Sequence, residues 1–364
     1  MIAFWYAAVA AMLTVYVVLD GFDFGVGILH LFVARTDAER REVLASIEPV
    51  WDGNEVWLIA SGGVLFLAFP RAYAAGFSGF YLPLMMVLWL LILRGISIEL
   101  RSHLDNPLWR SFWDAVLALA SATMAIVLGA ALGNVLRGVP LDQTGFFHGP
   151  LFTDFRLGRQ PGVLDWYTLL IGLFAFAALS AHGALYLAGR VQGRVLDRTL
   201  AVAQVAWPVV AVLGLVCIAT TRRVRPEIYQ NLLARPWSWP LVLVAAGGLL
   251  TVFDGLFRGR RRAAFRGSVA FLAGTLAATA AGSFPVLLSS TLGPDLSLTA
   301  GAAAAGEHGL RVGLAWWIPG ILLAVGYTAF MYRSRSHGHP SPAETGSNLR
   351  APASDERTPR PPSG

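Results

Sequence analysis

The stretch Asp20-Gly21-Phe22-Asp23-Phe24-Gly25-Val26-Gly27 lies inside the first apolar segment of the chain, which runs from Ile2 to Val33. Residues 2–19 are apolar apart from Thr14, and this length is enough for a helix to cross a bilayer core of about 30 Å. Two carboxylates therefore appear before the hydrophobic segment has ended. A carboxylate at membrane depth costs at least about 2.5 kcal/mol, so it should face protein or water and not lipid.

The spacing of these residues predicts a charged and closely packed helix face. Asp20 and Asp23 are three residues apart and share one face of a helix. Gly21 and Gly25 are four residues apart, so a neighbouring helix can approach closely there.

The composition is that of an integral membrane protein. The 364 residues are 55% hydrophobic and 14% charged, with a mean hydropathy of +0.58, which excludes an ordinary soluble domain. The single cysteine, Cys217, excludes a disulfide framework or a cysteine metal site within the chain. The net charge of +6 lies mostly in the connections and the tail, which indicates membrane topology and not nucleic-acid binding.

Apolar segments predict an all-α, polytopic membrane protein of about nine transmembrane helices. The predicted spans are 3–33, 54–69, 77–98, 111–136, 163–189, 200–220, 239–256, 267–290 and 310–332. Pro285 is expected to kink the eighth span and to free backbone groups that Ser283, Ser289 or Ser290 could satisfy. Residues 37–48 predict a short interfacial helix, because charged and apolar residues alternate there at helical spacing.

The basic residues, all of them Arg, predict the orientation in the membrane. The odd-numbered connections and the tail carry 19 of the 28, and the opposite side carries 9. The positive-inside rule then places the N-terminus outside and the C-terminus in the cytoplasm. Under that orientation Asp20 lies about 26 Å from the outer end of the first helix, in the inner part of the membrane.

A second polar stretch, Trp51-Asp52-Gly53-Asn54-Glu55-Val56-Trp57, enters the second span from the cytoplasmic side. Asp52 and Glu55 have the spacing of a helix-capping pair, which is one interpretation. The other adds Asp52 to Asp20 and Asp23 as a row of protonatable groups that reaches inward from the cytoplasm. Arg94, at a similar depth in the third span, could pair with one of these carboxylates.

The histidines offer little support for haem ligation. Only His30 and His182 lie within or at the end of a predicted span, and a bis-histidine haem needs ligands at matched depth on facing helices. The alternative is that each histidine is a hydrogen-bonded packing residue. The chain also lacks metal-binding clusters, a phosphate-binding loop, a dinucleotide fingerprint and a nucleophile elbow.

The two polar stretches together closely resemble those of subunit II of the cytochrome bd family of quinol oxidases. Further similar stretches follow in matching order over nearly the whole chain; they are Ala75–Tyr81, Gly133–Pro140, Phe284-Pro285 with Ser289–Thr291, and Leu296–Thr299. Glu55 stands where many relatives carry Gln, which looks like the cyanide-insensitive branch of the family.

The resemblance implies a fold of two four-helix bundles and a peripheral helix. It divides the chain into 1–137 (first bundle), 138–162 (extracytoplasmic loop), 163–290 (second bundle), 291–333 (loop and peripheral span) and 334–364 (a disordered cytoplasmic tail, also indicated by its Pro/Ser/Arg-rich composition). It implies a bacterial inner-membrane heterodimer with subunit I, which holds haem b and haem d, while this chain binds no haem. A small single-span accessory subunit and a structural quinone occur in some relatives.

The implied reaction is the oxidation of quinol and the reduction of O2 to water with cytoplasmic protons. Asp20 and Asp52 are the first candidates for proton uptake, and Asp23 and Glu55 the second, because desolvated carboxylates can exchange protons near neutral pH. Arg94 is their candidate charge partner. The candidates for packing or an O2 path are Trp51, Trp57, Gly21 and Gly25. A secondary transporter and a purely structural scaffold are the competing functions.

Overall fold

Helices make up most of the part of the chain that the computed structural model describes, residues 1–334. The α-helices are α1 (Ile2–Val33), α2 (Asp37–Ala45), α3 (Trp51–Ala68), α4 (Pro70–Gly79), α5 (Tyr81–Leu100), α6 (Pro107–Arg137), α7 (Trp166–Leu187), α8 (Gly193–Val224), α9 (Pro226–Ala234), α10 (Trp239–Phe257), α11 (Arg261–Ser283), α12 (Ala300–Ala303) and α13 (Glu307–Ser334). The short elements are the 3₁₀ helices η1 (Pro236–Ser238) and η2 (Pro294–Leu296) and the strands β1 (Val286–Leu288) and β2 (Leu298–Thr299). The tail predicted to be disordered lies outside the described residues, apart from Ser334.

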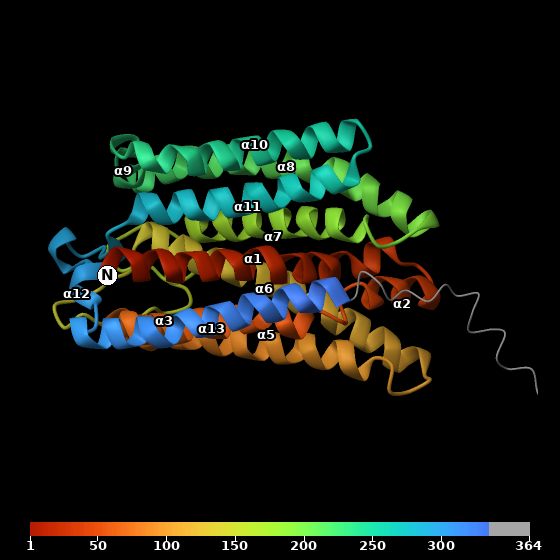
Figure 1. Ribbon diagram of the computed structural model, residues 1–364, viewed down its shortest axis with the longest axis horizontal. Coiled ribbons are helices and arrows are strands. Elements are labelled where there is room, and N and C mark those ends of the chain that lie inside the picture. The colour runs from red at the N-terminus through yellow and green to blue at the C-terminus, as the bar shows by residue number, and fades with distance from the viewer. Residues whose placement is uncertain (335–364) are drawn as a thin grey trace, which may run out of the picture. The chain divides into compact units, whose positions relative to one another are not determined.

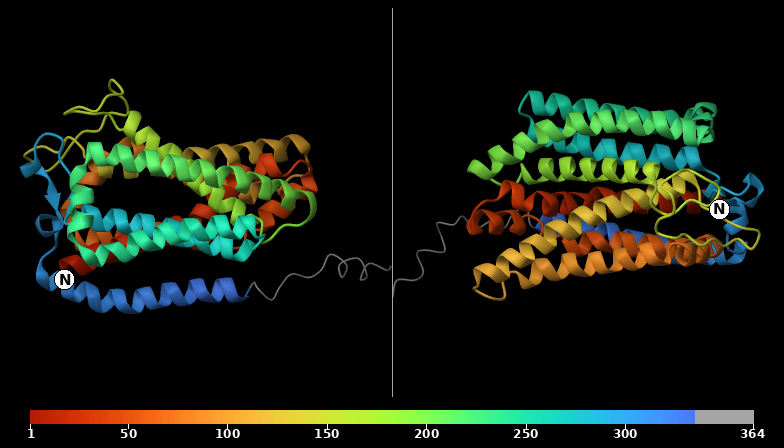
Figure 2. Two further views of the ribbon diagram at one scale, coloured as in Figure 1. Left: turned by 90° about the horizontal axis from the view of Figure 1, so that it is seen from above. Right: turned by 180° about the vertical axis from the view of Figure 1, so that it is seen from behind.

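The long helices of the unit Met1–Trp316 form two groups of four. In the first group α1 packs on α3 and α6, and α5 packs on α6; in the second, α7 packs on α8 and α11, and α10 on α11 and α8. The groups meet where α1 and α6 contact α7 and where α1 contacts α11 (Figure 1). Figure 2 shows from two further sides that these helices run alongside one another, with their connections at the two ends. The predicted all-α fold of two four-helix groups is confirmed.

Eight of the described helices are long and apolar enough to cross a membrane: α1, α5, α6, α7, α8, α10 with η1, α11 and α13. The chain is therefore a multi-pass membrane protein. The predicted second span is the helix α3, which is not among the eight. The physical reason is that its first five residues include Asp52, Asn54 and Glu55, which lower its mean hydropathy.

The prediction of a kinked eighth span is wrong. Helix α11 ends at Ser283, and the peptide bond between Phe284 and Pro285 is cis. Proline lacks a backbone N–H and cannot continue the helix, so the chain turns into β1, which pairs antiparallel with β2. The apolar residues 286–288 that prolonged the predicted span belong to this strand.

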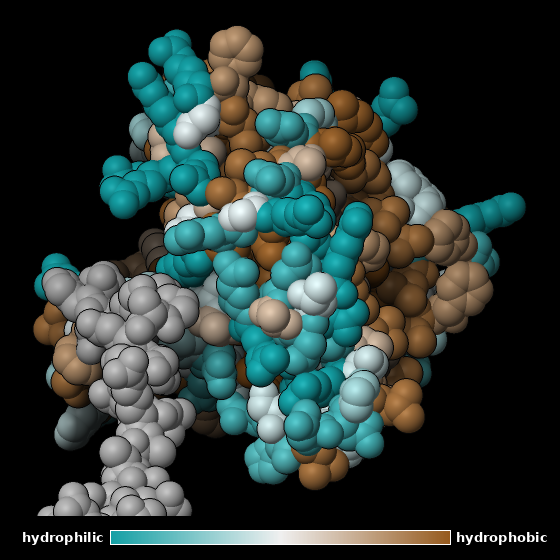
Figure 3. All heavy atoms as spheres, turned by 90° about the vertical axis from the view of Figure 1, so that its right-hand side faces the viewer, coloured by the Kyte–Doolittle hydropathy of each residue, from teal (hydrophilic) through white to brown (hydrophobic). Residues whose placement is uncertain are grey.

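The predicted interfacial helix is α2, and it begins with a complete capping box. The Thr36 side chain accepts a hydrogen bond from the Glu39 backbone N–H, and the Glu39 carboxylate accepts one from the Thr36 N–H. Glu39 also pairs with Arg198 on α8, at 2.5 Å. Figure 3 looks onto this end of the unit, where hydrophilic side chains gather. The end that carries α2 is thus also the arginine-rich end.

Glycines bring α1 and α7 into direct backbone contact, as their spacing predicted. A Cβ atom built on Gly25 would lie 2.1 Å from the carbonyl oxygen of Leu179 and 2.7 Å from the Cα of Gly183. One built on Gly21 would lie 2.8 Å from the Leu179 side chain. The carboxylates of α1 therefore lie on a helix whose backbone is in direct contact with that of α7.

We expect Gly25→Ala to lower the thermal stability of the purified complex. The added methyl group would collide with backbone atoms, and overpacking of this kind costs about 1–3 kcal/mol. The matched control is Gly247→Ala on α10, where a Cβ atom would meet nothing within 4 Å. That variant should be neutral or gain about 0.5–1 kcal/mol from the better helix former. Equal melting temperatures for the two variants would contradict the close α1–α7 packing.

The pairing of Glu39 with Arg198 predicts a pH dependence of stability. The hydrogen bond from Arg198, with that from the Arg35 backbone, lowers the pKa of Glu39 from 4.5 to about 2. The pKa of Glu39 is lower in the folded state than in the unfolded state. The pair with Arg198 therefore stabilises the folded state fully above the ordinary pKa of Glu39, and this stabilisation is lost as the pH falls toward 2. Between about pH 5 and about pH 3, Glu39→Gln should therefore lose less thermal stability than the parent. Identical losses would show that the pair contributes nothing.

Candidate functional site

A buried ion pair joins the first polar stretch to the third predicted span. The Arg94 guanidinium on α5 donates from NH1 to the Asp20 carboxylate on α1, at 2.7 Å, and from NH2 to the Glu55 carboxylate on α3. Asp20 is 0% exposed and Arg94 is 1% exposed. The Arg94 guanidinium also lies 4.4 Å from the centre of the Phe24 ring. The predicted pairing of Arg94 with a carboxylate is therefore present.

Asp23 lies beside this pair and is likewise buried. Its carboxylate accepts a hydrogen bond of 2.8 Å from the side-chain amide of Asn54, one turn into α3. Its other oxygen has no hydrogen-bond partner among the described residues. We call Asp20, Asp23, Asn54, Glu55 and Arg94 the Arg94 cluster. Asn54 was not singled out from the sequence, although it lies within the second polar stretch.

The Arg94 cluster contains three carboxyl groups and one guanidinium. Removing an uncompensated charge from water costs several kcal/mol, so a buried group of this composition favours retaining protons on its surplus carboxyls. Glu55 is 19% exposed at its side chain, whereas Asp20 is fully buried. Glu55 is therefore the member of the cluster with a path toward solvent or a partner surface.

Among the described residues, Asp52 forms no hydrogen bond or ion pair with the Arg94 cluster. It is exposed on the first turn of α3, three residues before Glu55. The capping interpretation of Asp52 and Glu55 is wrong, because α3 has Val50 at its N-cap with no side-chain cap hydrogen bond. Glu55 instead turns toward Arg94.

The two tryptophans of the second stretch pack on neighbouring helices. The Trp51 ring lies against Gly95 on α5, 3.0 Å from where a Cβ atom would stand. Trp57 is buried at 5% exposure. These contacts support the packing role, and the O2 path stays a prediction.

A second buried cluster, near the arginine-rich end, was missed. Asp114 on α6 is 0% exposed and lies 2.7 Å from His30 Nε2 on α1, and it accepts hydrogen bonds from Arg101 and Arg40. Arg101 in turn bonds Asp37 at the start of α2, at 2.8 Å. The signal was available, because Asp114 is a carboxylate inside a predicted span. We call Asp114, His30, Arg40 and Arg101 the Asp114 cluster, and it fastens α2 to the bundle.

Hydrogen bonds occupy both ring nitrogens of His182 and one of His30, whose Nδ1 has no partner among the described residues. Both ring nitrogens of His182 are engaged, by Ser268 Oγ at 2.7 Å and by the Val18 carbonyl oxygen at 3.0 Å. His30 uses Nε2 for Asp114. Among the described residues, no group of three or more His, Cys, Asp or Glu could hold a metal ion. The packing interpretation of these histidines is the one that the contacts support.

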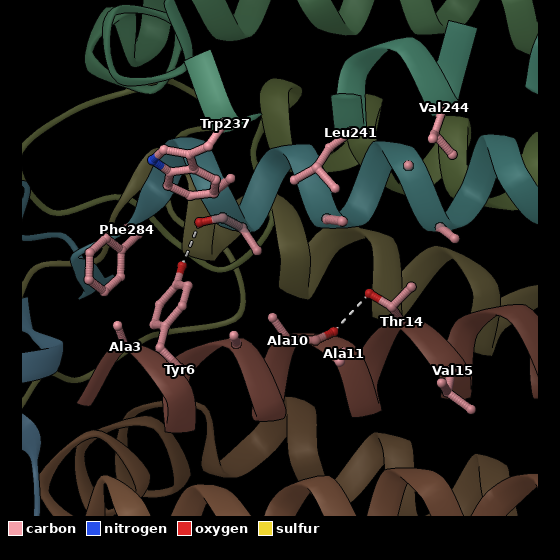
Figure 4. A pocket seen from close by; sticks show the side chains of 16 residues that line it. Ala3, Tyr6, Ala10, Ala11, Thr14, Val15, Trp237, Leu241, Val244 and Phe284 are labelled. Carbon is pink, nitrogen blue, oxygen red and sulfur yellow. Dashed lines mark hydrogen bonds between the residues drawn. The ribbon is translucent and has the colours of Figure 1, made fainter. Parts of the chain in front are cut away.

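An apolar cavity of about 510 Å³ opens between α1, α10 and α11 (Figure 4). Alanines such as Ala7 line it, with Trp237 and Phe284 at one end. Its two hydroxyl groups are already engaged: Tyr6 donates to the Ala280 carbonyl at 2.8 Å, and Thr14 to its own helix. The cavity therefore suits a hydrocarbon chain, because its lining is almost entirely apolar.

Comparisons with known proteins agree with this architecture. The model of the family "Cytochrome bd terminal oxidase subunit II" matches residues 1–335. The "Probable cytochrome oxidase subunit 2" of Haemophilus influenzae is 31% identical over 355 residues, covering 90% of this chain and 92% of that protein. The "Cytochrome bd ubiquinol oxidase subunit 2" of Bacillus subtilis is 28% identical over 343 residues, covering 92% and 97%.

Two further similarities are limited, one in the share of the chain that it covers and the other in sequence identity. The "Cytochrome bd-I ubiquinol oxidase subunit 2" of Escherichia coli K12 is 40% identical, but over 215 residues, which cover 59% of this chain and 54% of that protein. In fold, the chain is similar to the bd oxidase from Geobacillus thermodenitrificans, with a TM-score of 0.71 over 91% of this chain at 17% identity. From the match over residues 1–335 and the identity over nearly full length, we conclude that the chain belongs to the cytochrome bd terminal oxidase subunit II family.

Proposed function

We propose that the chain takes up protons from the cytoplasm for a heterodimeric quinol:O2 oxidoreductase of the respiratory chain. The membership in the subunit II family makes it a subunit of a terminal oxidase. The observation that carries the proton role is the Arg94 cluster, in which two carboxyl groups bond a single guanidinium and a third, Asp23, is buried beside them on Asn54. No contact of the described residues favours the secondary transporter.

The positions of these carboxyl groups give an order of proton transfer within this chain. A proton from cytoplasmic water reaches Asp52, which is exposed, and passes to Glu55 one turn further along α3. Glu55 then passes the proton to Asp20 or Asp23. Glu55 is left as a carboxylate anion, which its ion pair with Arg94 stabilises. The first step moves one proton from water to a carboxylate, each later step moves one proton between carboxyl groups, and Arg94 remains charged throughout.

The rest of the assembly follows from the family. In this proposal subunit I is the partner and holds haem b and haem d, which supply the electron transfer to O2. Membrane quinol and O2 are the substrates. A small single-span accessory subunit, of the kind that some relatives have, completes the complex. The complex lies in the bacterial inner membrane, with the N-terminus of this chain outside and the arginine-rich end in the cytoplasm.

We expect Asp20→Asn to assemble with a normal haem spectrum but to lose at least about tenfold in quinol-driven O2 uptake, because proton-transfer groups typically contribute about a hundredfold or more. Asn keeps the shape and an acceptor for Arg94 but cannot carry a proton. Asp254→Asn is the matched control, since Asp254 is exposed and pairs only with Arg258 at the end of α10. Asp52→Asn should show a smaller loss that grows as the pH rises. If Asp20→Asn turned over like the parent, the cluster would be a structural scaffold.

We also propose that the cavity between α1, α10 and α11 holds the isoprenoid chain of a structural quinone. Its apolar lining and its width, which the alanines of α1 provide, support this occupant. Ala7→Phe would place a ring in the cavity, and the purified complex should then retain less than half of the quinone that the parent retains, measured by solvent extraction and chromatography. Ala201→Phe, at an exposed position on α8 outside the cavity, is the control. Equal quinone content in both variants would exclude this cavity.

A further inference from the structure

A second and more polar cavity, of about 840 Å³, lies at the opposite end of the unit from α2. It is formed by the C-terminal ends of α8 and α11, the start of α9 and the segment that follows β1 (Figure 1). We call it the outer cleft. The proton relay and the quinone site of the preceding section do not involve it.

The cations of the outer cleft leave one positive charge without a partner. Arg137 forms an ion pair with Asp165, and Arg225 forms one with Glu227 at 3.2 Å. Arg223 also lines the cleft, is exposed, and has neither an ion pair nor a hydrogen bond among the described residues. The cleft therefore presents one unpaired guanidinium, the group best suited to a phosphate because it can bond two oxygens at once.

Hydroxyl groups face the same space. Ser283 and Ser289 line the cleft and make no side-chain hydrogen bond within the described part of the chain. The Ser297 hydroxyl accepts a hydrogen bond from the Ser290 backbone N–H at 3.0 Å, so its own proton remains free to be donated. The start of α9 adds its positive dipole end, because its N-cap residue, Arg225, provides no side-chain cap.

The depth of the cleft in the membrane indicates where a ligand would come from. Trp166 lines it, and Trp237 and Trp239 stand exposed at the same end, at 60% and 50%. Exposed indoles at the end of a span are typical of the headgroup level of a bilayer. A ligand at this depth is within reach of lipids and of the surrounding water.

We propose that the outer cleft binds the phosphodiester headgroup of an anionic phospholipid, with Arg223 as its principal contact. A phosphodiester carries a single negative charge, which equals the one unpaired positive charge of the cleft. Free inorganic phosphate shares the chemistry but carries roughly 1.5 negative charges at neutral pH, so part of its charge stays uncompensated. The apolar residues of the lining, such as Val224 and Ile228, lie where the glycerol and the upper acyl chain would rest.

The test uses the purified oxidase complex, delipidated in mild detergent and titrated with phosphatidylglycerol under native mass spectrometry. Arg223→Ala should raise the dissociation constant of the tightest phosphatidylglycerol about tenfold or more, as expected for the loss of a charge-assisted hydrogen bond. Arg223→Lys should retain only part of the affinity, because an ammonium keeps the charge but cannot bond two phosphate oxygens in the paired geometry of a guanidinium. Arg222→Ala is the matched control, because Arg222 is the adjacent exposed arginine and does not line the cleft.

The outcomes separate the two sources of phosphate. A loss in Arg223→Ala alone, unaffected by millimolar inorganic phosphate, supports the lipid headgroup. Equal affinities for the parent, Arg223→Ala and Arg222→Ala would overturn the site. Binding of inorganic phosphate that depends on Arg223, without binding of phosphatidylglycerol, would overturn the lipid assignment. None of these readouts depends on oxidase activity, so the proposal stands or fails independently of the proton role.

Discussion

The buried guanidinium of Arg94 determines how the first group of helices can pack. It reaches Asp20 on α1 and Glu55 on α3 from α5, so one side chain joins three helices. Breaking a buried pair by removing one partner typically costs about 3–5 kcal/mol, because the remaining charge is left uncompensated. Any arrangement of α1, α3 and α5 that separates these groups is therefore strongly disfavoured. The same constraint keeps a surplus of carboxyl groups at membrane depth, where the proposed chemistry needs them.

Helix α1 connects the two groups of helices through a different interaction. One of its faces carries the carboxylates that meet α3 and α5, and its glycines meet the backbone of α7. Dispersion forces and close fit hold the second contact, since lipid provides little hydrophobic drive for helix association. The position of the Arg94 cluster relative to the second group is thus set by the contact between Gly25 and Gly183. A polar site is placed by apolar packing next to it.

The sequence predicts most of the fold and part of the candidate site. Charges within apolar segments are rare, so Asp20, Asp23 and Arg94 stood out, and the structure brings them together. Asp114 gives the same signal and could have been found by applying that criterion to every span. The contact of Asn54 with Asp23 could not be predicted, because the polarity of Asn54 does not indicate which group it bonds and its partner lies on another helix. Pro285 was misjudged because the strand after it is as apolar as the helix before it.

The separation of Asp20 and Arg94 along the chain has a consequence for biogenesis. The two residues are 74 positions apart, and at about 5–20 residues per second a ribosome needs roughly 4–15 s to make the intervening segment. During that interval α1 is already synthesised while its charge partner does not yet exist. A protonated, neutral Asp20 is the form that can wait at membrane depth at least cost. The nascent chain therefore passes through a state in which Asp20, the group proposed to exchange protons, has no arginine to stabilise its anion.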